Sequence, residues 1–120
     1  MATWTNALKT NRLDIAKGGP AIVWEIANHE IGSGAIEDFQ INRIDCQGKT
    51  ANTITFTGVT VTVGSGVPKI YAVWVDELNN ELAEVELVVG QNKVVGRYLK
   101  LRVKETNSNT ATYSAVVRLD

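Results

Sequence analysis

The chain has 120 residues, a formal net charge of −1 and a hydrophobic fraction of 44%. This length suits a single domain with one core, and the composition argues against disorder. No run approaches the roughly eighteen apolar residues of a membrane-spanning helix. The mixed, nearly balanced charge also argues against nucleic acid or an anionic membrane as a partner.

The first eleven residues, MATWTNALKTN, show no strong period and no apolar stretch typical of a secretory signal. We therefore expect a protein made in the cytoplasm, in which residues 1–11 form a short N-terminal arm and residues 12–120 form one β-domain. Trp4 and Leu8 are the apolar side chains that such an arm would offer to a protein partner.

From residue 12 onward the hydrophobic pattern has a period of two, which is typical of strands with one buried face. RLDIA, beginning at Arg12, predicts a short first strand, and AIVWEIA places Ile22, Trp24 and Ile26 on one face. EDFQINRI, from Glu37, favours a strand over a short helix because of its β-branched neighbours. We expect Trp24 to lie in the core.

The next runs predict a bent strand and a central strand. In ITFTGVTVTV, Ile54 and Phe56 share one parity, whereas Val59, Val61 and Val63 take the other. The change of phase at Gly58 predicts a β-bulge or a bend. KIYAVWV is apolar at both parities, which indicates a strand covered on both faces with Trp74 in the core.

The last third alternates most regularly. LAEVELVV predicts a strand with Glu84 and Glu86 outward, and the final two runs predict a closing hairpin around the polar loop ETNSNT. Seven residues of these two runs share odd parity and are predicted to face the core: Leu99, Leu101, Val103, Tyr113, Ala115, Val117 and Leu119. Since the last run completes the core, we expect deletion of 116–120 to unfold the protein.

Turn signals separate the runs at AKGGP, IGSG, CQGK, GSGVP, ELNN and VGQN. Short strands at a spacing of about 8–12 residues with Gly- and Asn-containing turns indicate a sandwich or barrel. The predicted fold is all-β: a single antiparallel β-sandwich of about seven or eight strands, jelly-roll or immunoglobulin-like.

A catalytic or metal site is not expected. His29 is the only histidine, and with Glu30 it supplies half a metal site at most. The serines of the turns, Ser33, Ser65 and Ser108, lie outside any Gly-x-Ser-x-Gly motif. Cys46 is the only cysteine and is predicted to be a buried, unreactive thiol. These features predict a protein that is not an enzyme and needs no cofactor.

Two binding alternatives stay open. The loop DELNNE, residues 76–81, groups oxygen-bearing side chains that suit calcium, although such loops are usually solvated turns. The basic stripe Arg97, Lys100, Arg102 and Lys104, with Tyr98 among it, has the composition of a single-stranded nucleic-acid surface. Glu84 and Glu86 favour a different interpretation, in which this face is solvated and pairs its own charges.

The compact all-β chain with an arm, no signal and no catalytic set resembles the small decoration, or cement, proteins of tailed-phage virions. This resemblance implies a structural role on a capsid, with homo-oligomeric contacts and the capsid protein as partner. GRYLKLRV, residues 96–103, is also similar to the late strands of galactose-binding jelly rolls. That similarity implies the alternative function, a carbohydrate-binding β-sandwich in which exposed Trp and Tyr rings form a stacking platform.

Overall fold

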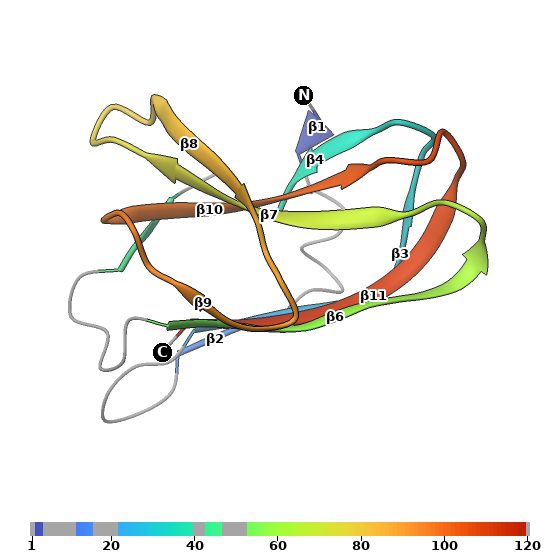
Figure 1. Cartoon of the computed structure of the whole chain (residues 1–120), viewed down its shortest axis with the longest axis horizontal. Coiled ribbons are helices and arrows are strands. Elements are labelled where there is room, and N and C mark those ends of the chain that lie inside the picture. The colour runs from blue at the N-terminus through green and yellow to red at the C-terminus, as the bar shows by residue number, and fades with distance from the viewer. Residues whose placement is uncertain (1, 4–11, 16–21, 40–42, 47–52, 120) are drawn as a thin grey trace.

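The computed structural model describes residues 2–3, 12–15, 22–39, 43–46 and 53–119, and these form two sheets packed face to face (Figure 1). The first sheet, sheet A, has the order β1 (Ala2–Thr3), β4 (Ile36–Asp38), β10 (Tyr98–Glu105), β7 (Pro68–Val75), β8 (Glu81–Glu86), with β5 (Ile44–Asp45) also paired to β10. The second, sheet B, has the order β2 (Arg12–Ile15), β3 (Ile22–Ile31), β11 (Ala111–Leu119), β6 (Thr53–Gly64), β9 (Gly90–Lys93).

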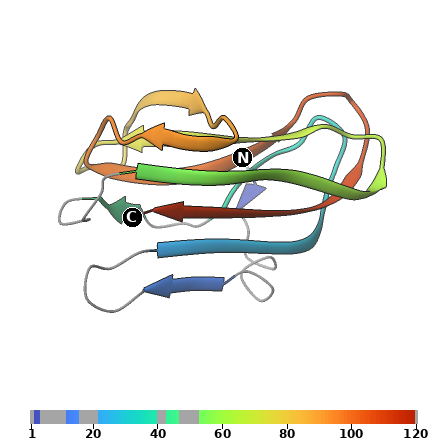
Figure 2. The same cartoon turned by 60° about the horizontal axis from the view of Figure 1, so that its bottom comes forward.

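All neighbouring strands are antiparallel except β1, which runs parallel to β4. Figure 2 shows the strands of sheet B side by side, with β9 covering only part of β6. The predicted all-β sandwich is therefore confirmed. Strands β1 and β9 were not predicted, because neither segment carries an alternating apolar pattern.

The strand order distinguishes between the two predicted sandwich types. Four pairs of neighbours are nested along the chain: β3 with β11, β4 with β10, β6 with β9, and β7 with β8. An immunoglobulin sandwich has the different order ABED and CFG. The nested pairing is that of a jelly roll, an eight-stranded double Greek key, to which β1, β2 and β5 add short strands.

The predicted closing hairpin is wrong. Strands β10 and β11 lie in opposite sheets, and each is central in its own sheet. The loop between them therefore crosses the sandwich instead of turning back within one sheet. The inward parity is nevertheless confirmed, because all seven predicted side chains are buried.

The core lies between these central strands. Trp24 and Trp74 are both buried, as predicted, and Cys46 is also buried against the same cluster. Strand β7 is covered on both faces over its second half, where Val73 and Val75 are buried as well as Ala72 and Trp74. This confirms its interpretation as a central strand.

Strand β6 contains the predicted bulge. Between Phe56 and Val59, two residues of β6 lie opposite one residue of β11, and Gly58 has a φ of 96°. This is a conformation that glycine adopts without a Cβ clash. A second register shift, at Thr62, turns Val63 to the outer face, where it is 65% exposed. The prediction that Val59, Val61 and Val63 share one face of the strand is therefore wrong for Val63.

Candidate functional site

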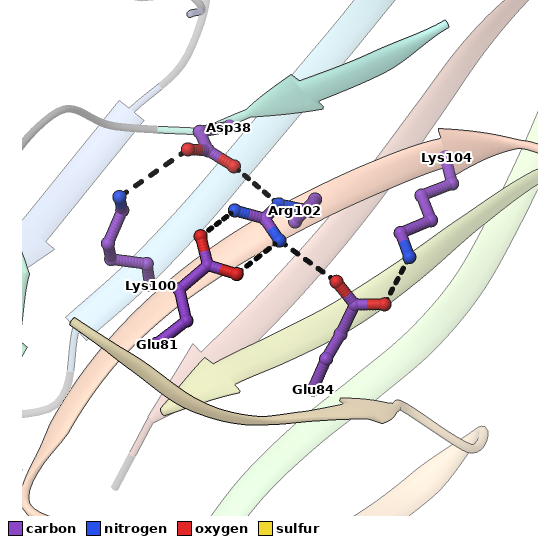
Figure 3. A network of polar contacts seen from close by, with 6 residues as sticks. All are labelled: Asp38, Glu81, Glu84, Lys100, Arg102 and Lys104. Atoms are coloured by element: carbon purple, nitrogen blue, oxygen red, sulfur yellow. Dashed lines mark hydrogen bonds and ion pairs between the residues drawn. The ribbon is translucent and has the colours of Figure 1, made fainter. Parts of the chain in front are cut away.

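The outer face of sheet A carries a set of charged side chains around Arg102 (Figure 3). The set, here called the Arg102 cluster, consists of Asp38 on β4, Glu81 and Glu84 on β8, and Lys100, Arg102 and Lys104 on β10. Alternation along β10 brings its three cations to this face, since Leu99, Leu101 and Val103 occupy the inner one.

Arg102 is the centre of the cluster. Its Nε lies 2.8 Å from Oδ1 of Asp38, and its terminal nitrogens lie 2.6 and 3.0 Å from the carboxylate oxygens of Glu81. A further contact of 2.9 Å reaches Glu84, which also binds Lys104. The guanidinium thus donates to carboxylates from both flanks of sheet A, the geometry that arginine forks favour.

These contacts shift the pKa values of the groups involved. The hydrogen bond from Arg102 lowers the pKa of Glu81. Burial acts to raise the pKa of Glu84, but the hydrogen bonds from Lys104 and Arg102 outweigh it and lower the value. Both carboxylates are therefore held in the charged form.

The cluster pairs its own charges, as predicted for Glu84, whereas Glu86 pairs with Lys69 outside the cluster. It contains three carboxylates and three cations, so it leaves no surplus positive charge within the set. The expectation of a solvated face is wrong for Asp38, Lys100 and Arg102, which are 3%, 7% and 5% exposed, whereas Glu81, Glu84 and Lys104 keep contact with solvent. Strand β7 also lies between β8 and β10, so the glutamates reach across it instead of pairing on an adjacent strand.

Arg97 precedes β10 and Tyr98 is its first residue, and both line a pocket of about 470 Å³. The guanidinium carbons of Arg43 and Arg97 lie 4.5 and 5.0 Å from the centre of the Tyr98 ring, and Arg97 also pairs with Asp45 at 3.2 Å. Val75, Leu78 and Leu82 are among the other lining residues. Among the described tryptophans and tyrosines none is fully exposed, so these residues form no open stacking platform.

The DELNNE loop uses its first carboxylate to stabilise its own turn. Asp76 accepts hydrogen bonds from the backbone amides of Leu78 and Asn80 and from the Asn80 side chain, and the backbone amide of Asn80 is the main cause of a lowered pKa of Asp76. Glu81, at the other end of the loop, turns to Arg102. Across the described ranges no group of three or more His, Cys, Asp or Glu side chains is placed to hold a metal ion.

His29 pairs with Glu37 instead of its sequence neighbour Glu30. Its Nε2 lies 3.0 Å from Oε2 of Glu37, on β4 in the opposite sheet, and its ring meets the buried ring of Tyr113 edge-on at 6.0 Å. Burial raises the pKa of Tyr113. The pair therefore links β3 to β4 across one side of the sandwich.

Glu105, at the end of β10, organises three loops and was not singled out in the sequence. Its carboxylate accepts backbone N–H groups from Gly34, Val67, Asn107 and Asn109. Burial acts to raise its pKa, but the four amides together lower it to about 2. Asn107 and Asn109 belong to the ETNSNT loop that begins with Glu105. This closeness in the sequence is the only local indication that Glu105 would bind these amides.

An apolar groove of about 350 Å³ opens on the side of the sandwich between β6, β7 and the β8–β9 connection. Phe56, Ile70 and Leu87 line it, together with Val59, Val88 and Val89, and the mutually paired Lys69 and Glu86 are its charged lining residues. Next to Val59 on the inner face of β6 is Val61, which is 39% exposed, while Val88 and Val89 are 61% and 72% exposed. Val59, Val61, Val88 and Val89 are here called the apolar flank.

Trp4 and Leu8, the predicted partner-binding residues, lie outside the described residues, so their role stays a prediction. Ala2–Thr3 pairs with β4 in sheet A, and Arg12–Ile15 pairs with β3 in sheet B.

The comparisons with known proteins found no relative: no protein-family model matches the chain, and no curated protein or solved structure is significantly similar to it. Within the described part of the chain, no helix has the length and apolar character needed to cross a membrane.

Proposed function

We propose that this protein is a non-enzymatic structural protein that acts by assembling with other protein subunits, first of all with copies of itself. The observation that carries the proposal is the apolar flank, in which the exposed Val88 and Val89 line a groove and the exposed Val61 follows Val59 on the same face of β6. Contiguous exposed apolar surface of this kind marks protein interaction sites.

The charged groups support a structural role over a catalytic one. Arg102 and Glu105, the most heavily hydrogen-bonded charged side chains of the described residues, both bind groups of the protein itself. Their contacts hold strands and loops in place and stiffen sheet A around β10. A rigid sandwich with an apolar side suits a subunit that is added to a larger assembly.

Decoration of a virion capsid is the specific form of this function that we propose. Its support is the resemblance in size and layout to cement proteins, together with the jelly-roll order, which is frequent in viral capsid domains. Since one fold serves many functions, the fold argument is an analogy. The partners would be further copies and a capsid protein.

The mass of the purified protein in solution tests the assembly role. Sedimentation velocity at about 5 and about 200 μM should show a dimer or larger oligomer that grows with concentration, as mass action requires. A monomer at both concentrations contradicts self-assembly.

Carbohydrate binding is the second candidate, and the pocket beside Tyr98 is the observation that favours it. Lectin domains also use jelly rolls, and the pocket combines an aromatic ring with polar groups, as sugar sites do. Binding to a glycan array, abolished by Tyr98→Ala, would support this function. An array without signal would remove it.

A further inference from the structure

Strand β6 has one edge that is only half covered. Along one side it pairs with β11 from Ile54 to Gly64, whereas on the other side β9 pairs only with Thr53–Phe56. No other strand of the described chain pairs with the outer edge of 57–64 (Figure 2). Such an edge presents backbone donors and acceptors that can pair with another chain.

The uncovered part of β6 has few of the features that usually block an open edge. It contains neither a charged residue nor a proline, and its sequence TGVTVTVG alternates threonine and valine. The two register shifts, at Gly58 and Thr62, leave Val59–Val61 as a regular stretch between them. Thr60 pairs with Ser114 on the outer face and is exposed, whereas Val59 and Val61 lie on the inner face beside the groove.

We infer that this edge is the seam between two copies of the chain, which pair antiparallel through β6 about a two-fold axis at Thr60. The inference rests on the proposed self-assembly and specifies its contact surface. Pairing centred at Thr60 places Val59 of each copy opposite Val61 of the other, and threonine opposite threonine. Both are favourable cross-strand pairs.

A second copy is the partner that this surface fits. Residues 57–64 carry no charge, so two identical edges meet without like-charge repulsion. A partner that recognises its target through charge would find no charged side chain on this edge. Strands in a sheet lie about 4.8 Å apart, so Val61 of one copy would cover part of the groove mouth of the other. The two-fold contact is closed and gives a dimer instead of a fibre.

Complementary charges at Thr60 provide the test. In the symmetric pair residue 60 faces itself, so Thr60→Lys should place two lysines together, and Thr60→Glu two glutamates. Each variant alone should raise the dissociation constant of the dimer at least about tenfold by sedimentation, the change expected from about 1.4 kcal/mol of lost pairing. An equimolar mixture should restore association, because lysine then faces glutamate.

Val95→Lys is the matched control, since Val95 is 66% exposed and follows β9, whose last residue Lys93 pairs with Thr53, at the end of β6 that the seam does not include. It should associate like the wild type. If both Thr60 variants associate like the wild type, the β6 seam is wrong while self-assembly stands. If the wild type is monomeric at every concentration, the seam and the proposed self-assembly both fail.

Hydrogen–deuterium exchange of the wild type gives a second measurement that needs no variant. Between about 5 and about 200 μM, amides of residues 57–64 should become slower to exchange as the dimer forms. Unchanged exchange in this segment, in an oligomeric sample, overturns the seam.

Discussion

Arg102 and Asp38 are register partners on neighbouring strands, and the Nε of the first lies 2.8 Å from Oδ1 of the second. Both side chains are buried although they lie on the outer face of sheet A. Asp38 also lies 3.4 Å from the Nζ of Lys100. One carboxylate therefore pairs with two buried cations, and for Lys100 it is the partner within the Arg102 cluster.

Replacing Asp38 with asparagine should destabilise the protein strongly. The amide keeps the shape of the side chain but removes the negative charge, which leaves two buried cations with less compensation. Breaking a buried pair costs about 3–5 kcal/mol, and we expect about 3 because Glu81 and Glu84 still bind Arg102. Urea unfolding measures this change.

Glu86→Gln is the control for the loss of one carboxylate on the same face. Glu86 pairs with Lys69 at 3.9 Å, and their side chains are 49% and 42% exposed. Exposed pairs contribute about 0–1 kcal/mol, so this variant should unfold almost like the wild type. If Asp38→Asn and Glu86→Gln lower the free energy of unfolding equally, burial does not determine how much the ion pairs of the Arg102 cluster stabilise the protein.

Glu105 should make the free energy of unfolding depend on pH in the acid range. Its pKa is about 2 in the folded protein against an ordinary value of 4.5. A depressed pKa contributes stability that is complete above the unfolded value and is lost as the pH falls towards the folded one. Glu105→Gln should therefore lower the unfolding free energy at pH 7 and flatten its decline between about pH 4.5 and about pH 2.5.

Urea unfolding at a series of pH values measures that slope. Glu77→Gln, which removes an exposed carboxylate in the β7–β8 turn, is the control for the loss of one negative charge. A Glu105→Gln protein with the wild-type acid profile would mean that the four amides do not hold the charged form.

Cys46 should react slowly with thiol reagents in the folded protein. The side chain is 2% exposed within the core cluster, and a buried thiol reacts only when the structure opens. A chromogenic disulfide reagent should label it slowly in buffer and at once in urea. Fast stoichiometric labelling under native conditions would contradict the packing around β5.

The end of β11 should be indispensable. Val117 and Leu119 are fully buried in a strand flanked by β3 and β6. Leu119→Ala should lower the free energy of unfolding by about 2–5 kcal/mol. Deletion of residues 116–120 should remove more than the net stability of an ordinary domain, about 5–15 kcal/mol, and so leave the protein unfolded. Circular dichroism melts measure both changes.

Val63→Ala is the control for the loss of a side chain in a strand of the same sheet. Val63 is 65% exposed, so this variant should stay within about 0.5 kcal/mol of the wild type. A protein truncated after Ala115 that melts like the full chain would overturn the assignment of β11 to the core.

In β10 and β11 the sequence was sufficient to predict which side chains face inward, because period two depends on the residues of each strand alone, whereas in β6 a second register shift reversed the face of Val63. Leu99 and Tyr113 were both placed correctly in this way. It could not identify their neighbours, since the polar loop from Thr106 to Thr110 is equally suited to a hairpin and to a crossing between sheets. The strand order is a property of the whole fold.

The burial of Arg102 illustrates the same limit at the level of the site. Its parity predicted the outer face correctly. The carboxylates that surround it come from β4 and β8, 64, 21 and 18 residues away in the chain. The alternation of the glutamates indicated a pairing with Glu84, but nothing in the sequence indicated that Asp38 and Glu81 would also meet Arg102 there.

The placement of β11 between β3 and β6 has a kinetic consequence. Asn28 on β3 and Ser114 on β11 are joined by a hydrogen bond and are 86 residues apart in the chain. In sheet B, β11 is the strand that joins β3 to β6. Strands β2 and β3 can pair locally, but sheet B cannot grow from β3 to β6 until the distant β11 has joined it. Chains dominated by such distant pairings fold in milliseconds to seconds, and until β11 is inserted the inner edges of β3 and β6 remain open to other chains.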